Sequence, residues 1–253
     1  MRIAIFFALD DEFLPFRNLA RQRASEVRLL TAGRFAQRLG LTFQVGEKTV
    51  IVATTGSGAR NAGEWARAAA FTDCAWFLAA GVAGGISPNL DTGDVVLAAH
   101  VYLRQPGEFE LVHSARGAAG SVTGARSGDL VTVPHVLITQ QDKAQLYASF
   151  DHDGRRADTM LADMESAAIA QAAREQGARF AAIRAVSDTA GEDLPLDFNQ
   201  YLDARGNVNR GRIAREALTR PVLFRQLTRL GRNTKVACVR LAEVVWQWIE
   251  QVP

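Results

Sequence analysis

Short apolar runs alternate with alanine-rich segments along the first 190 residues of the chain. The runs are rich in Val, Ile and Phe, as buried strands are, and the segments between them have helical periodicity. This alternation favours a largely parallel sheet with helices on both faces. We expect strands at 3–9, 42–45, 49–54, 76–80, 94–101, 136–139 and 180–186, and helices at 11–19, 59–71, 142–150 and 164–175.

Two stretches depart from this pattern. Residues 105–133 carry many Gly, Ser and Arg residues, which indicates an irregular excursion or a short hairpin. Beyond Gly191 the chain has the pattern of helices, and in the last one apolar residues recur every three to four positions from Val236 to Ile249. We therefore predict an α/β domain at 1–192 and a helical C-terminal extension at 193–253, packed on or beside it.

Composition narrows the class of protein. The chain has 253 residues, of which 48% are hydrophobic and 22% charged, and its net charge of +2 gives no argument for binding nucleic acid. The two cysteines and four histidines lack metal-ligand spacing, so we expect neither a metal nor a cofactor. The apolar run at 3–9 is too short for a signal peptide or a membrane span, and we expect a cytoplasmic protein.

Three acids follow the first predicted strand directly: Asp10, Asp11 and Glu12. In parallel sheets, ligands bind at the carboxyl ends of strands, so an acid placed there faces a candidate cleft. The alternative is structural, because acids also cap helix N-termini and complement the helix dipole.

Two glycine-rich segments follow other predicted strands. Residues 56–61 (GSGARN) open a helix, where free amides suit an anion or a polar oxygen, although a tight turn explains them equally well. Asn61 occupies the third glycine position of a dinucleotide fingerprint, which disfavours an NAD-dependent oxidoreductase. Residues 80–88 (AGVAGGISP) hold three glycines in five positions, which indicates backbone lying against a small molecule.

Two further segments place acids at the ends of elements. Glu165 begins a helix of small apolar residues, where a buried carboxylate needs a partner such as sugar hydroxyls, unless it serves only its own helix. The strand at 180–186 ends in Ser187 and Asp188. Arg184 lies inside this apolar run and needs a carboxylate partner, for which Glu12 and Glu165 are the candidates.

These five elements, in this order, resemble the purine nucleoside phosphorylase and nucleosidase superfamily, and methylthioadenosine/S-adenosylhomocysteine nucleosidases in particular. The resemblance covers about residues 1–190. It implies a three-layer α/β fold, with a central, mostly parallel mixed sheet flanked by helices. It also implies cleavage of the bond between a purine and its sugar, and a homodimer or higher homo-oligomer.

The resemblance implies roles for individual residues. Asp188 would protonate N7 of the leaving purine, with Ser187 holding it. Glu165, with Met164, would bind the ribose hydroxyls and stabilise an oxocarbenium-like transition state. Glu12 would activate water, with Arg184 near it. The remaining expected substrate-binding residues are Gly58, Ala80, Gly81 and Val82, the last standing where many members have Ser or Thr.

Three features resemble the hopanoid-associated phosphorylase branch more than the nucleosidases: the sequence GVAGGISP, the segment Asp-Met-Glu-Ser-Ala and a basic tail. Members of that branch are implicated in removing adenine from adenosylhopane. Ten Lys or Arg residues lie between Arg205 and Arg240, against one acid, Glu216. Two interpretations of such helices involve lipid: they would flank a lipid substrate or rest weakly on an anionic membrane surface. In the alternative they pack on the core and present a solvated basic face or a subunit contact. The loop at 139–143 does not match the nucleosidase segment that binds the base; adenine is the base we expect.

The nucleophile is either water or phosphate. Phosphorolysis requires a cationic pocket, for which the matched elements offer Arg60 and Arg184. The position after the first strand, where phosphate-using hexameric members carry an arginine, is acidic here, and Glu12 would repel phosphate. We therefore expect hydrolysis, with phosphate-dependent cleavage and a non-catalytic nucleoside-binding module as the alternatives.

Overall fold

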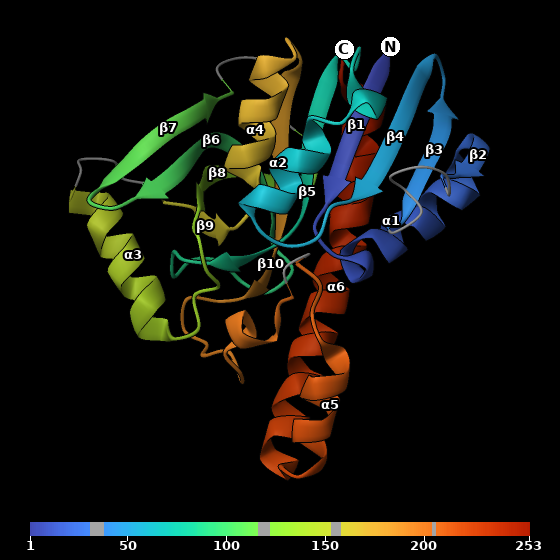
Figure 1. Ribbon diagram of the computed structural model, residues 1–253. Coiled ribbons are helices and arrows are strands. Elements are labelled where there is room, and N and C mark those ends of the chain that lie inside the picture. The colour runs from blue at the N-terminus through green and yellow to red at the C-terminus, as the bar shows by residue number, and fades with distance from the viewer. Residues whose placement is uncertain (31–37, 116–121, 153–157, 204–205) are drawn as a thin grey trace.

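A computed structural model describes residues 1–30, 38–115, 122–152, 158–203 and 206–253. Its centre is one mixed sheet with the strand order β10-β6-β8-β9-β5-β1-β4-β3-β2, in which β7 pairs with β6 (Figure 1). The strands are β1 (Arg2–Phe7), β2 (Ser25–Leu29), β3 (Gly40–Val45), β4 (Lys48–Thr54), β5 (Trp76–Gly85), β6 (Val95–Gln105), β7 (Glu108–Ser114), β8 (Ala125–Thr132), β9 (Met160–Asp163) and β10 (Arg179–Asp188).

Helices flank this sheet, which confirms the predicted α/β fold. They are α1 (Asp10–Arg23), α2 (Ala59–Ala66), α3 (Gln140–His152), α4 (Ser166–Glu175), α5 (Arg210–Leu218) and α6 (Pro221–Gln251), with 3-10 turns η2 (Ala69–Phe71) and η3 (Phe198–Tyr201). Strands β4, β1, β5 and β10 are parallel neighbours. An additional pairing of β10 with β5 closes β5, β9, β8, β6 and β10 into a ring.

The two faces of the sheet have separate cores because strand side chains alternate between faces. Ile3 and Ile5 of β1 pack in one cluster with residues of α1 and α6, whereas Ala4 and Phe6 pack in another with residues of α2 and α4. A third cluster joins α3 to β6, β8 and β9 through Phe150. Helices thus cover both faces, as the sequence predicts.

Helix α6 belongs to the core along one half only. Ala237, Leu241, Val245 and Trp248 are buried in the cluster shared with β1 and α1. Its first half leaves the sheet and, with α5 beside it, projects below the rest of the molecule (Figure 1). We call α5 and residues 221–236 of α6 the arm. Among the described residues, no helix combines the length and apolarity that crossing a membrane requires. The domain boundary at residue 192 stays a prediction.

Several predicted elements differ from the observed ones. Residues 136–139 are not a strand, because their backbone binds residues outside the sheet: Val136 N–H donates to the Asn199 side chain of η3, and Leu194 N–H donates to Ile138 C=O. The excursion at 105–133 instead supplies β7 and β8 to the sheet; residues 116–121 of it lie outside the described residues. Strand β5 continues through the glycines to Gly85, since β10 pairs along that segment. The helix predicted at 59–71 ends at Ala66.

Trp248 tests how far α6 stabilises the domain. Its side chain is buried and packs edge-to-face on Trp76, with ring centroids 5.5 Å apart. Trp248→Ala should lower the free energy of unfolding by about 3–5 kcal/mol, as measured by denaturant titration. The control Val236→Ala, at an exposed position of the same helix, should change it by less than about 1 kcal/mol. Equal effects of the two substitutions would contradict the burial of α6 in the core.

Candidate active site

The ends of several strands enclose a cavity of about 170 Å³. Because β1, β5 and β10 are parallel neighbours, the residues that follow or end them meet at one edge of the sheet. Six of the predicted site residues line the cavity: Glu12, Val82, Met164, Glu165, Ser187 and Asp188.

Glu12 is buried at the first turn of α1, and backbone amides hold it from two sides. Its Oε2 accepts hydrogen bonds from Ala8 N (3.0 Å) and Leu9 N (2.9 Å), and its Oε1 accepts one from Val82 N (3.0 Å). Burial raises the pKa of this carboxyl above its usual range, against the lowering effects of Arg184 and the amides. Glu12 therefore caps its own helix and also lines the cavity, so both sequence interpretations describe it.

Glu165 stands at the start of α4 and binds the glycine-rich segment at 56–61. Its Oε1 accepts a hydrogen bond from Gly58 N (2.8 Å) and one from Ser57 Oγ (3.3 Å). Burial, with smaller contributions from the carboxylates of Asp163 and Glu12, raises its pKa to about 7, although Arg184 acts in the opposite direction. Gly58, an expected substrate contact, thus binds Glu165.

Arg184 is fully buried behind the wall of the cavity. Its Nη2 donates to Asp163 Oδ2, to Ser166 Oγ (3.1 Å) and, more weakly, to Glu165 Oε2 (3.4 Å). Asp163 is a partner that sequence reasoning missed. Nearby carboxylates, that of Asp163 foremost, raise the pKa of Arg184 against the opposing effect of burial. The guanidinium therefore supplies positive charge to several carboxylates at once.

The space that Arg184 needs comes from Gly81 on the neighbouring strand. A Cβ at this position would lie 2.3 Å from Arg184 Nη1 and 3.0 Å from Glu12 Oε1. Gly81 and Ala80 are buried in β5 and do not line the cavity. Gly81 instead lets the charged side chains of α1 and β10 approach each other.

Asp188 ends β10 and has partners on both carboxylate oxygens. Ser187 Oγ donates to its Oδ1 (2.6 Å), and Lys143 Nζ lies 2.6 Å from its Oδ2. The ammonium of Lys143 is fully buried and also donates to the carbonyls of Thr189 (2.7 Å) and Glu192 (2.9 Å). Sequence reasoning missed Lys143. The available signal was that residues 139–143, expected as a loop, do not match the nucleosidase pattern; in the structure Lys143 lies in the first turn of α3.

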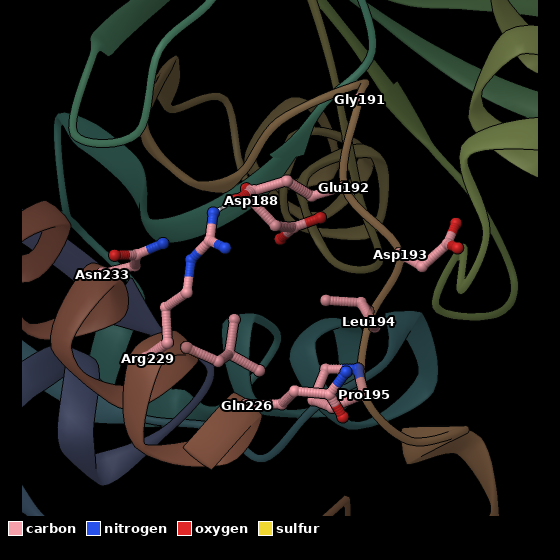
Figure 2. A pocket seen from close by; sticks show the side chains of 10 residues that line it. Asp188, Gly191, Glu192, Asp193, Leu194, Pro195, Gln226, Arg229 and Asn233 are labelled. Atoms are coloured by element: carbon pink, nitrogen blue, oxygen red, sulfur yellow. Dashed lines mark hydrogen bonds and ion pairs between the residues drawn. The ribbon is translucent and has the colours of Figure 1, made fainter. Parts of the chain in front are cut away.

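The loop after Asp188 is tied to α6. Figure 2 shows Arg229 reaching from α6 to Glu192, with which it forms an ion pair, beside a hollow of about 360 Å³. Glu192 also accepts a hydrogen bond from Thr189 N (3.1 Å). The loop that carries the Lys143 acceptors is thereby held between α3 and α6.

Cationic side chains are scarce in the small cavity. Within the described residues, its lining includes Lys143 but no arginine. Arg60, a candidate for phosphate binding, has an 87% exposed side chain that pairs with Glu64 on the surface. Arg184, the other candidate, is engaged behind the wall by carboxylates. The rest of the lining consists of acids, Ser57, Ser187, and apolar or small residues.

A groove of about 1000 Å³ opens from the cavity between α1 and α6. The two share Leu9, Val82, Asp188 and other lining residues. The groove is mainly apolar, and its walls include Leu14, Pro15 and Leu19 of α1 and Leu227, Leu230 and Val239 of α6.

Comparison with known proteins assigns the chain to a family. The family model described as "Phosphorylase superfamily" matches residues 2–219. The chain belongs to this superfamily. A 5'-methylthioadenosine/S-adenosylhomocysteine nucleosidase of Hydrogenovibrio crunogenus is 28% identical over 240 residues, which cover 87% of this chain and 98% of the relative. A nucleosidase of the same name from Shewanella halifaxensis is 30% identical over 155 residues, only 50% of this chain and 62% of the relative.

A solved structure shares the fold. The 5'-methylthioadenosine/S-adenosyl homocysteine nucleosidase of Helicobacter pylori superposes with a TM-score of 0.70 at 14% identity, covering 99% of this chain and 98% of that chain. At this identity the likeness establishes the architecture alone. It confirms the nucleoside phosphorylase-like fold that the sequence predicts.

The raised pKa of Glu165 makes stability depend on pH. An unfolded Glu165 loses its proton near pH 4.5, whereas the folded one keeps it to about pH 7. Its contribution is therefore fully present below pH 4.5 and is lost as the pH rises to about 7. The free energy of unfolding of the wild type minus that of Glu165→Gln should fall over this range by on the order of 3 kcal/mol, measured by denaturant titration. A difference that stays flat or rises with pH would refute the assignment.

Proposed function

We propose that the protein hydrolyses the N-glycosidic bond of a purine nucleoside. The observation that carries this proposal is one small cavity lined by four carboxylates. Asp163 pairs with the buried Arg184, whereas Glu12, Glu165 and Asp188 are held by different partners. Breaking the bond requires a proton for the leaving base, negative charge beside the cationic sugar, and a base for the nucleophile. Three separately held carboxylates meet these three requirements, as the two carboxylates of glycoside hydrolases do.

Asp188 would deliver the proton to N7 while the bond between the sugar and the purine breaks. Ser187 and Lys143 fix its two oxygens, and the Lys143 ammonium is a proton source within hydrogen-bond distance. A positioned acid of this kind typically accelerates a reaction by about 10²–10⁴-fold.

Glu165 and Glu12 would act on the sugar and the water. Glu165 would bind the ribose hydroxyls, beside Met164, and stabilise the positive charge that develops on the sugar. Glu12 would take a proton from water as the oxygen attacks the sugar carbon. The base thus gains a proton and the sugar a hydroxyl, so the reaction adds one water in total.

The charges favour water over phosphate as nucleophile. A phosphate dianion would lie beside Glu12 and Glu165, and the described lining has no arginine to neutralise it. Lys143 is committed to Asp188 and two carbonyls, and Arg184 to acidic side chains. Water needs only a base, which Glu12 provides.

A purine-release assay with and without phosphate tests this. We expect release of free base and free ribose at the same rate in phosphate-free buffer and in phosphate buffer. Strict dependence on phosphate, with ribose 1-phosphate as product, would show phosphorolysis instead.

Asp188→Asn separates catalysis from binding in the same assay. The variant keeps the shape of the side chain and loses the proton transfer, so release should fall at least about 10²-fold while nucleoside binding persists. A wild type that binds nucleosides in a calorimetric titration and never releases base would establish the non-catalytic alternative.

We further propose that the base is adenine and that the 5′ position carries a large apolar substituent. The Helicobacter pylori nucleosidase is complexed with a 4-amino-pyrrolo[3,2-d]pyrimidine that carries a thioether arm. In this chain the three carboxylates account for the base, the sugar hydroxyls and the water, which leaves the 5′ carbon to face the groove. A lipid-linked nucleoside such as adenosylhopane has the chemistry that the groove would take.

A series of 5′-alkylthio adenosines tests the groove. Since each buried methylene gains about 0.8 kcal/mol, kcat/KM should rise up to about fourfold per methylene as the chain grows from methyl to octyl. Val239→Asp, at an exposed groove position, should reduce this gain, while the control Val236→Asp, one turn away and outside the described lining, should not. A kcat/KM that is flat or falls with chain length would refute the proposal.

The resemblance to nucleosidases also leads us to propose a homodimer or higher homo-oligomer. Strand β7 supports this, because among the described strands it pairs only with β6 and carries Leu111 exposed at its surface.

A further inference from the structure

The end of the arm exposes apolar side chains that the body of the protein does not cover. Leu218 is 83% exposed, Val222 68% and Phe224 58%, and they flank the turn between α5 and α6. We call residues 218–224 the tip. Of the eight large hydrophobic residues exposed among the described residues, five belong to α5 or α6. The apolar exposure is therefore concentrated on this part of the molecule.

The same region carries a large excess of positive charge. Between Arg210 and Arg232 there are seven arginines and one acid, Glu216. Three of these arginines form ion pairs: Arg210 with Asp11, Arg220 with Glu216 and Arg229 with Glu192. In the part of the chain that the structure describes, the exposed side chains of Arg215, Arg225 and Arg232 form no ion pair. Four of these seven arginines thus stand outside any ion pair of the described residues, which leaves the arm with an excess of positive charge.

The arm places this tip at an extreme of the molecule. In Figure 1 the turn between α5 and α6 lies at the end of the arm farthest from the sheet. Leu223 and Ala217 are buried between the two helices, so the turn is packed although its flanks are exposed. A flat surface can therefore meet the tip without meeting the sheet.

We propose that the tip inserts into the surface of an anionic lipid bilayer. Apolar side chains gain free energy at the boundary between headgroups and acyl chains, and arginines around them bind the lipid phosphates. The long arginine side chains can lie along the apolar surface while their charged ends remain among the headgroups.

The chemistry of the tip disfavours two other occupants. A nucleic acid would satisfy the arginines but leave Leu218, Val222 and Phe224 without a partner. A second copy of the tip would cover those residues but bring arginines against arginines, which like-charge repulsion opposes. An anionic bilayer accommodates both kinds of side chain together.

Flotation with lipid vesicles tests the proposal on the full chain. The protein should float with vesicles of phosphatidylcholine containing phosphatidylglycerol and float much less with phosphatidylcholine alone, and high salt should weaken the association. The variant Leu218→Ser/Val222→Ser/Phe224→Ser should reduce the bound fraction at least tenfold. Neutralising Arg225 or Arg232 to Gln should weaken binding up to about fivefold for each arginine.

Two controls keep this test independent of the proposed reaction. Leu29→Ser, at an exposed apolar site on β2, should float like the wild type. Cleavage of a soluble nucleoside should be unchanged in the triple variant and in both arginine variants, because the substituted residues lie outside the described linings of the cavity and the groove. If the triple variant fails to fold, the arginine variants decide.

Three outcomes would overturn the proposal. The first is equal flotation with neutral and anionic vesicles, and the second is wild-type flotation by the triple or the arginine variants. The third combines two results: the wild type does not bind vesicles, and the triple variant has a different mass in solution from the wild type by light scattering. That result would assign the tip to contact between copies.

Discussion

The arrangement of the site depends on the ion pairs that the buried Arg184 guanidinium forms. A buried cation requires partners, and Arg184 finds them in Asp163, Glu165 and Ser166, with the Glu12 carboxylate close enough to contribute charge. These residues come from β9, the start of α4 and the start of α1. One cation therefore fixes how three separate segments meet, and Gly81 leaves room for it.

The site divides its charge between two groups of residues. Arg184 is close to the carboxylates that would face the sugar and the water, whereas Lys143 pairs with Asp188 and donates to two backbone carbonyls. Glu12 and Glu165 have raised pKa values because burial outweighs their amide and arginine partners. The two acids can therefore exchange protons in a range of pH where an ordinary surface glutamate stays ionised.

Sequence patterns predicted the parts of the site that local chemistry determines. Each of the three acids, Glu12, Glu165 and Asp188, follows or ends a buried element, and such a position can be recognised from the sequence alone. Lys143 was not predictable in this way, since only the fold brings residue 143 beside residue 188. Asp163 was missed as the partner of Arg184 for the same reason. Strand β8 was missed because its Arg, Ser and Gly residues mask the alternation, and β7 because it lies within the same irregular stretch. Of the apolar residues mistaken for a strand at 136–139, Val136 and Leu137 line the cavity.

The continuity of α6 has a geometric consequence. One unbroken helix of 31 residues is about 46 Å long, and about 24 Å of that lies in the arm. Because the other half is locked into the core, the arm acts as a rigid spacer of set length and direction. Helix α6 also lines the groove. The distance and the angle between the mouth of the groove and any surface that the end of the arm contacts are therefore fixed.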